Sequence, residues 1–236
     1  MRNISKSFRG LRAVRDVSFE IPEGTISALI GPNGAGKTTI FNMVAGVYAP
    51  NSGSILFQTR PIHGLRPDEV CAAGIGRTFQ IVKPFAGLSV LDNVMVGAFL
   101  NERHAAAARR HAADILEKLG LGPRLHLPAS ALTLPDRKRL EVARALATRP
   151  KLLLLDEVMA GLRPTECDQM VEVFRELNRT QGLTILLIEH VMRAVMALAR
   201  HIGVLHHGEL IARGAPEQVV RDPAVLECYL GEETEI

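Results

Sequence analysis

Residues 31–38 of the chain, GPNGAGKT, match the pattern G-x-x-x-x-G-K-[ST] at every fixed position. An apolar run at residues 25–30 leads into this segment, and helix-forming residues 37–45 follow it. Gly34 and Gly36 allow the backbone to turn tightly, so that its N–H groups face inward, where the helix also directs its positive end. The segment therefore predicts a strand, a phosphate-binding loop and a helix in succession.

The residues of such a loop hold the phosphates of a nucleotide. Lys37 can reach the β- and γ-phosphates, and the hydroxyl of Thr38 can bind Mg²⁺. A glycine-rich turn that matches the pattern by accident is the alternative, and the strand and the helix on either side argue against it. The expected nucleotide-binding residues of the loop are Gly31, Pro32, Asn33, Gly34, Ala35, Gly36, Lys37, Thr38 and Thr39.

Two acidic residues, Asp156 and Glu157, directly follow the apolar run at residues 152–155. A lone carboxylate at the end of a buried strand is costly unless it faces a cation or a network of hydrogen bonds. Beside a phosphate-binding loop, Asp156 is therefore expected to ligate Mg²⁺ in its outer shell or through water, and Glu157 to polarise an attacking water. The alternative is an acidic pair that is simply exposed to solvent at the end of a strand.

Apolar runs alternate with helical patterns along most of the chain, which predicts a mostly parallel sheet covered by helices on both faces. From residue 90 to residue 147 only helical patterns occur, so a helical insert interrupts this α/β core. The expected strands are residues 17–21, 25–30, 54–57, 152–155, 184–188, 202–205 and 209–212. The expected helices are residues 37–45, 90–100, 105–119, 137–147, 166–179 and 192–199.

The composition argues against several classes of protein. Hydrophobic residues make up 47% and charged residues 22%, as in a globular protein. A net charge of +3 with no long Lys/Arg run gives no basis for nucleic-acid binding. The cysteines, Cys71, Cys167 and Cys228, share no close spacing, so neither a zinc site nor a disulfide framework is expected. The apolar runs are too short to span a bilayer, so we expect membrane association only through a partner.

Together with these motifs, the order of three further residues resembles the ATP-binding-cassette transporter ATPases over about residues 3–230. The resemblance implies that Phe8 stacks on adenine, that Gln80 in RTFQ senses the γ-phosphate and touches Mg²⁺, and that His190 in LIEH contacts the γ-phosphate. Taken singly, Gln80 reads as an ordinary polar residue and His190 as a capping or surface histidine. The implied cofactors are ATP and Mg²⁺. The implied catalytic residues are Glu157, His190 and Gln80, and the implied metal-binding residues are Thr38, Gln80 and Asp156.

The resemblance also implies a fold. We expect an α/β P-loop NTPase core with a mostly parallel sheet, an antiparallel β portion at the N-terminus and an inserted helical subdomain. All 236 residues then form one ATPase domain, with residues 1–80 and 150–236 in the core and residues 81–149 in the helical subdomain. The first strand of this fold usually begins earlier, so we expect upstream residues that the sequence does not include.

A closer likeness is to the ATPase subunits of branched-chain amino-acid importers. The stretches that carry it are GRTFQ at residues 76–80, RLEVARA at 139–145, AGL at 160–162 and YLG at 229–231. This likeness implies a subunit that powers import of branched-chain amino acids, or of related small polar solutes such as urea-like or amide compounds.

The same likeness implies partners and a location. The partners are a second ATPase, identical or different, separate permease subunits docked near Gln80 and the helical insert, and indirectly a periplasmic solute-binding protein. The location is the cytoplasmic face of the inner membrane, where the permease holds the subunit.

The segment that departs most from the family pattern is residues 132–136, LTLPD, where the family signature is LSGGQ. In the family this segment faces the nucleotide of a second ATPase, and Thr133 keeps the hydroxyl that is expected to contact it. Leu134 lacks the conformational freedom of glycine, and Pro135 has no N–H to donate. Asp136 adds negative charge near the expected phosphate, and Arg137 is placed to offset it. The side that holds the chain's own nucleotide therefore follows the pattern better than the side offered to a partner.

Three other functions are compatible with the phosphate-binding loop. A translation factor or chromosome-organising ATPase usually carries tandem cassettes or a long coiled coil, and this sequence has neither. A P-loop kinase for a small molecule leaves the order of Gln80, residues 137–145 and His190 unexplained. A nucleotide-binding regulator that does not hydrolyse has no use for Glu157 and His190. The sequence therefore favours a transporter ATPase.

Overall fold

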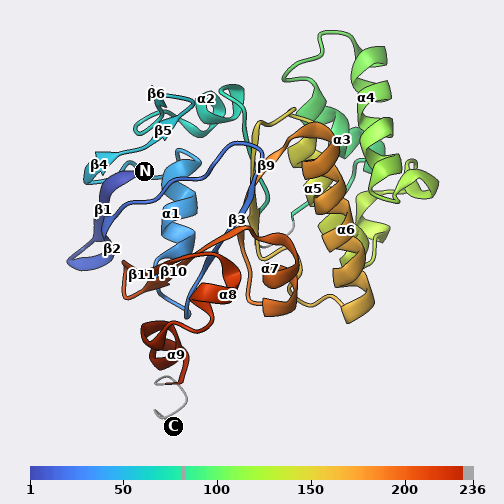
Figure 1. Ribbon diagram of the computed structural model, residues 1–236. Coiled ribbons are helices and arrows are strands. Elements are labelled where there is room, and N and C mark those ends of the chain that lie inside the picture. Colours follow the sequence, from blue (N-terminus) through green and yellow to red (C-terminus); the bar gives the residue numbers. More distant parts are fainter. Residues whose placement is uncertain (81–82, 231–236) are drawn as a thin grey trace.

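The computed structural model of the chain, shown in Figure 1, describes residues 1–80 and 83–230. Two parts of the sequence predictions lie outside the described residues. They are Gly231 of the C-terminal YLG stretch and residues 81 and 82, at the start of the expected helical subdomain. The central sheet has six strands in the order β11-β10-β3-β9-β8-β7. These strands are β3 (Ile26–Ile30), β7 (Ile75–Arg77), β8 (Leu152–Asp156), β9 (Thr184–Ile188), β10 (His201–His206) and β11 (Glu209–Gly214). All neighbours pair in parallel except β10 and β11, so the mostly parallel sheet is confirmed.

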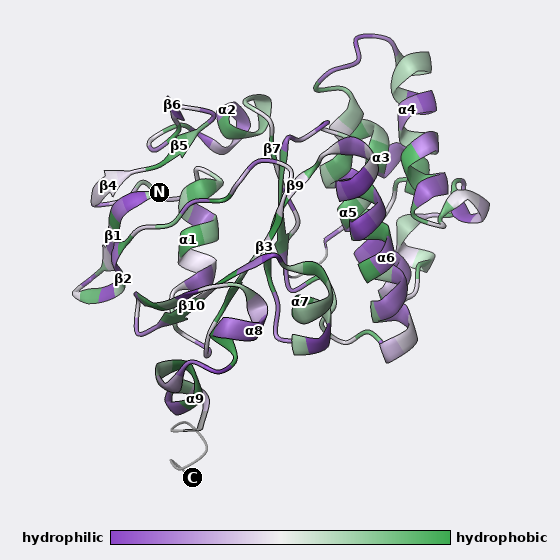
Figure 2. Ribbon diagram, viewed as in Figure 1, coloured by the Kyte–Doolittle hydropathy of each residue, from purple (hydrophilic) through white to green (hydrophobic). Residues whose placement is uncertain are grey.

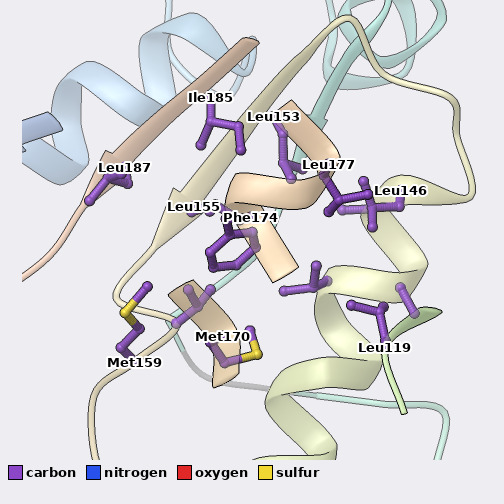
Figure 3. Packing of buried hydrophobic residues seen from close by; sticks show 14 of the residues in the cluster. Leu119, Leu146, Leu153, Leu155, Met159, Met170, Phe174, Leu177, Ile185 and Leu187 are labelled. Atoms are coloured by element: carbon purple, nitrogen blue, oxygen red, sulfur yellow. The ribbon is translucent and has the colours of Figure 1, made fainter. Parts of the chain in front are cut away.

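Strands β3, β8 and β9 are buried at every residue because both faces of the sheet are covered. Successive side chains of a strand point to opposite faces, so each strand contributes to two hydrophobic clusters. Leu153 and Leu155 pack with Phe174 in the cluster shown in Figure 3. Leu152 and Leu154 pack on the opposite face with the helix that follows the phosphate-binding loop. In Figure 2 hydrophobic residues gather in the central strands, and hydrophilic residues mark the outer surface of the helix labelled α6.

The N-terminal part is antiparallel, as expected. Strands β1 (Arg2–Phe8), β2 (Leu11–Val17) and β4 (Ser52–Ser54) form a sheet in the order β2-β1-β4, and β5 (Leu56–Phe57) pairs with β6 (Arg60–Pro61). The expected strand at residues 17–21 is wrong, because β2 already ends at Val17. Val17 and Phe19 are both buried, so the alternation is real. Val17 still pairs with Ile4, but residues 18–21 pair with no strand in the described part of the chain and run into Pro22, which has no N–H to donate.

Helices cover both faces of the central sheet. Figure 1 shows α1 (Lys37–Val44) on one side and α3 (Val90–Ala98), α4 (Ala105–Lys118), α5 (Leu134–Leu146) and α6 (Pro164–Gln181) on the other. The remaining helices are α2 (Pro67–Ala72), α7 (Met192–Leu198), α8 (Pro216–Val219) and α9 (Pro223–Leu230), with single 3₁₀ turns η1 (Gly122–Arg124) and η2 (Ala129–Ala131). Helix α3 contacts both α4 and α5. The division into a core and a helical subdomain at residues 81–149 stays a prediction. Among the described residues, no helix combines the length and the apolar character needed to cross a membrane.

Candidate functional site

The phosphate-binding loop lies between the end of β3 and the start of α1, pressed against two neighbouring strands. A Cβ atom on Gly31 would lie 2.0 Å from the carbonyl oxygen of Leu205, and one on Gly36 would lie 2.4 Å from the carbonyl oxygen of Ala13. Both glycines also have positive φ angles, 141° and 104°, which side chains rarely permit. Only glycine therefore allows this loop to approach β10 and β2 so closely.

Lys37, the first residue of α1, is buried and crosses the loop. Its Nζ atom donates hydrogen bonds to the carbonyl oxygens of Gly31 at 2.6 Å and Pro32 at 2.8 Å. In the described chain, no side chain caps the N-terminus of α1, and the first turn of the helix holds no acidic residue. An anion at this point would therefore meet backbone N–H groups, the positive end of the helix and an ammonium group.

A hollow of about 440 Å³ opens beside the loop. Residues 33–39 line it together with Phe8, Gln80 and Glu157. The Phe8 ring is 36% exposed and meets the Tyr48 ring edge-on at 5.1 Å between centroids. The structure thus brings the residue expected to stack on adenine to the same hollow as the phosphate-binding loop, although β1 and α1 are separate in the sequence.

Asp156 ends β8 and is 2% exposed. Its Oδ2 atom accepts a hydrogen bond from the guanidinium of Arg77 at 3.0 Å, and Arg77 in turn donates to Asn42 at 2.6 Å. Burial raises the pKa of Asp156, and the Arg77 guanidinium partly opposes that rise.

The Oδ1 atom of Asp156 is buried without a hydrogen-bond partner among the described residues. A buried carboxylate oxygen of this kind needs water or a cation to be satisfied. Asp156 lines a second hollow together with Thr38 and Gln80, so the residues expected to bind Mg²⁺ face one space. This donor set of hydroxyl, amide and carboxylate oxygens suits Mg²⁺.

Glu157 follows β8 with a φ angle of 50°, in the left-handed region that non-glycine residues rarely adopt. Its backbone N–H donates to the carbonyl oxygen of Ile188 at 2.9 Å, which ties it to the end of β9. One carboxylate oxygen accepts from Gln80 Nε2 at 2.6 Å, and the other lies 3.0 Å from His190 Nε2. The three residues expected to be catalytic, which lie on three different segments, therefore meet at one carboxylate.

Sequence reasoning missed three charged residues near Asp156 and Glu157: Arg77, Lys138 and Glu189. Lys138 lies on α5, is 5% exposed and donates from Nζ to the backbone oxygen of Glu157 at 2.9 Å. Glu189 is 2% exposed, and its carboxylate accepts from the backbone N–H of Met159 at 2.9 Å. Glu189 directly follows the apolar run of β9, and Asp156 directly follows the apolar run of β8 and ends that strand, so the same signal was present in the sequence. Nothing in the sequence around α5 distinguishes the buried Lys138 from the half-buried Arg137 and Arg139 beside it.

Thr133 immediately precedes α5. It is not among the described residues that line the hollow beside the phosphate-binding loop of its own chain. Its hydroxyl donates to Asp136 Oδ2 at 2.8 Å. The expectation that Arg137 offsets the charge of Asp136 is wrong. Arg124 pairs with Asp136 at 3.2 Å, whereas Arg137 donates to the carbonyl oxygen of Ser130 at 3.0 Å. Asp136 is 6% exposed, and its partner Arg124 is the last residue of η1.

Comparison with known proteins places these features in a family. Residues 14–160 match the family described as "ABC transporter", and residues 209–235 match "Branched-chain amino acid ATP-binding cassette transporter". The high-affinity branched-chain amino acid transport ATP-binding protein LivG of Salmonella typhimurium is 41% identical, with 95% of this chain and 94% of that protein covered. The corresponding protein BraF of Pseudomonas aeruginosa is 37% identical, with 97% and 96% covered. A crystal structure of an ATP-binding cassette of an ABC transporter in its ADP conformation superposes with a TM-score of 0.88 at 31% identity, covering 98% of this chain and 97% of that one.

Proposed function

Because this chain belongs to the ABC transporter ATPases, we propose that its ATP hydrolysis powers import of branched-chain amino acids, or of closely related small polar solutes, through separate permease subunits. The ATPase activity is that of the family. The proposal for the solute is supported by similarity over nearly the whole chain to two branched-chain amino acid transport proteins, and by the separate match at residues 209–235.

We propose that the nucleotide lies in the hollow beside the loop, with its phosphates at the start of α1. The backbone N–H groups of residues 33–39 and the Lys37 ammonium would hold the β- and γ-phosphates, because they are the donors gathered there. The exposed Phe8 ring would stack on the adenine, and the edge-on contact with Tyr48 keeps that ring in place. The positive φ angles of the loop glycines are needed for this cradle.

Thr38, Gln80 and Asp156 are the residues proposed to hold Mg²⁺. The support is the unpartnered Oδ1 atom of Asp156, together with the hollow that the three residues share. When bound, the ion would neutralise charge that develops on the phosphate oxygens. Arg77 holds the other oxygen of Asp156, so the free oxygen keeps one direction.

Glu157 is proposed to orient the attacking water and to accept its proton. Its left-handed backbone turns the carboxylate back toward the loop, where it lines the same hollow as Lys37. Gln80 and His190 hold its two oxygens, so both donors must also serve the γ-phosphate or give way to the water during the reaction. The observation that carries the hydrolytic mechanism is this single carboxylate, which three segments position beside the phosphate-binding loop.

The proposed partners are a second ATPase subunit, the same or different, permease subunits that dock near Gln80 and α3–α5, and indirectly a periplasmic solute-binding protein. The proposed location is the cytoplasmic face of the inner membrane, and no nucleic-acid partner is proposed. Exposed apolar side chains near Gln80 and on α3 support permease docking there. These side chains are Phe79, Phe85, Leu88, Val96 and Phe99.

The test is transport by the reconstituted complex. Vesicles would hold the permease with this chain and its partner ATPase, and the solute-binding protein would be supplied outside. ATP-dependent uptake of labelled leucine, isoleucine and valine is expected, with competition among the three. Uptake of urea or a short amide without uptake of these amino acids would contradict the assigned solute and leave the ATPase assignment intact.

A further inference from the structure

We propose that Lys138 is a positioning residue for hydrolysis, which holds the backbone of Glu157 so that its carboxylate faces the phosphate-binding loop. This inference rests on the proposed role of Glu157. The observation that carries it is a buried ammonium group on α5, bonded to the carbonyl oxygen of the residue whose side chain is proposed to act on water.

The turn that contains Glu157 needs external support. The residue adopts a φ angle of 50°, a conformation that costs free energy in a residue with a side chain and persists only where the surroundings enforce it. Its N–H is fixed by the end of β9 at 2.9 Å, and its carbonyl oxygen accepts from Lys138 at 2.9 Å. Within the turn, the N–H of Ala160 approaches the same oxygen only at 3.3 Å. Of these two hydrogen bonds to the oxygen of Glu157, the one from Lys138 is therefore the shorter.

Lys138 also interacts with the charges of four carboxylates, those of the buried Glu189, Asp156 and Glu141 and of the half-buried Glu157. Burial, the largest effect, lowers the pKa of the Lys138 ammonium, and the charges of these four carboxylates partly oppose that fall. Glu189 holds the N–H of Met159, two residues beyond Glu157, and the Met159 side chain is anchored in the hydrophobic cluster of Figure 3. The turn is thus fixed at both ends, by Lys138 and by Glu189.

This arrangement links α5 to the reaction. Helix α5 begins at Leu134, directly after Thr133, so the segment offered to a partner ATPase and the ammonium that holds Glu157 lie on one rigid element. A shift of α5 would move the backbone of Glu157 through Lys138. A misplacement of about 1 Å at a reacting group lowers a rate by roughly 100-fold.

The test is single-turnover ATP hydrolysis by the full chain assembled with its permease, in Lys138→Met, Lys138→Gln and Lys138→Arg. Methionine keeps the apolar stem of lysine as far as Cε but removes the Nζ donors, so we expect the rate constant to fall about 10- to 100-fold. Affinity for ATP, measured by equilibrium titration, is expected to stay within about twofold, since Lys138 is not among the described residues that line the nucleotide hollow. Arginine is expected to restore most of the rate, and glutamine, which keeps a donor without the charge, to give an intermediate rate.

Two controls separate this role from a general loss of structure. Lys118→Met makes the same change at an exposed position at the end of α4 and is expected to leave the rate unchanged. In a Glu157→Gln background, Lys138→Met is expected to add almost no further loss, because both changes act on one group.

An unchanged rate in Lys138→Met would overturn the inference, as would a loss that multiplies fully with that of Glu157→Gln. If Lys138→Met does not fold, a rate in Lys138→Gln equal to that of the natural chain overturns it instead. Normal turnover by Glu157→Gln would instead remove the proposed role of Glu157 itself, which distinguishes the two failures.

Discussion

Glu189 is a buried carboxylate whose ionisation opposes folding, and this makes a quantitative prediction about pH. Burial is the largest effect and raises the pKa of Glu189 from 4.5 to about 7, although the Met159 N–H and the Lys138 ammonium oppose the rise. A group whose pKa is higher in the folded chain holds its proton there over a range in which the unfolded chain has released it. Stability therefore falls as the pH rises from about 4.5 through about 7.

The size of the effect follows from the shift. One pKa unit corresponds to about 1.4 kcal/mol, so the rise in the pKa of Glu189 corresponds to a loss of about 3 kcal/mol above neutral pH. Glu189→Gln removes the titrating group while its amide oxygen can still accept from the Met159 N–H. We therefore expect the variant to gain about 3 kcal/mol relative to the natural chain between pH 5 and pH 8.5.

The assay is urea unfolding of the full chain at half-unit intervals over this pH range, for the natural chain and for Glu189→Gln. Other titrating groups are common to both proteins and cancel in the difference. Glu172→Gln, the same substitution at an exposed position on α6, is the matched control and is expected to give a flat difference. Parallel pH profiles for Glu189→Gln and the natural chain would refute the reasoning, because Glu189 would then titrate alike when folded and unfolded.

Further predictions concern the nucleotide and the second ATPase. Glu157→Gln is expected to bind ATP but to hydrolyse it roughly 10²–10⁴-fold more slowly in the assembled transporter. Steady-state turnover near that of the natural chain would remove Glu157 from its assigned role. Lys37→Ala is expected to weaken ATP binding by about 1.5–3 kcal/mol, and Phe8→Ala by less, as measured by titration with a fluorescent ATP analogue. Unchanged affinity in Lys37→Ala would contradict the phosphate-binding loop. If residues 132–136 serve a partner's nucleotide poorly, Glu157→Gln should abolish most ATPase activity of a mixed complex, while the equivalent change in the partner leaves much of it. Equal losses from the two changes, or vigorous hydrolysis by two copies of this chain, would contradict that asymmetry.

The parts of the fold that the sequence predicts well are those in which one local pattern decides the structure. Strands β3, β8 and β9 are short runs of apolar residues, and burial on both faces leaves no alternation to misread. The expected strand at residues 17–21 fails because alternating burial of Val17 and Phe19 does not require a partner strand. Strand β7 was missed because its three residues carry too little pattern, and its place at the edge of the sheet depends on pairing with β8.

The site could be predicted where a residue type and its spacing already determine the chemistry. The phosphate-binding loop is of this kind, because its glycines are needed by the backbone itself. Lys138 and Arg77 could not be predicted, since their importance arises only when α5 and β7 are brought beside the end of β8. A basic residue on a helix carries no sign in the sequence that its ammonium will be buried against a carbonyl oxygen 19 residues away.

In the signature segment, residues 132–136, a charged side chain faces other groups in the fold than the sequence led us to expect. Asp136 was expected to place negative charge where a partner's phosphate lies, but it is 6% exposed and held by Arg124 and Thr133. Its charge is therefore largely neutralised within the chain, and the repulsion expected from it is weakened. The segment exposes Thr133 and, at the first position of α5, Leu134, which is 49% exposed. Any deficiency of this surface toward a nucleotide should then come from the bulk of Leu134 and the missing N–H of Pro135. Replacing Leu134 and Pro135 by glycine should therefore improve hydrolysis of the partner's nucleotide, which residues 132–136 face, more than replacing Asp136 by glutamine does.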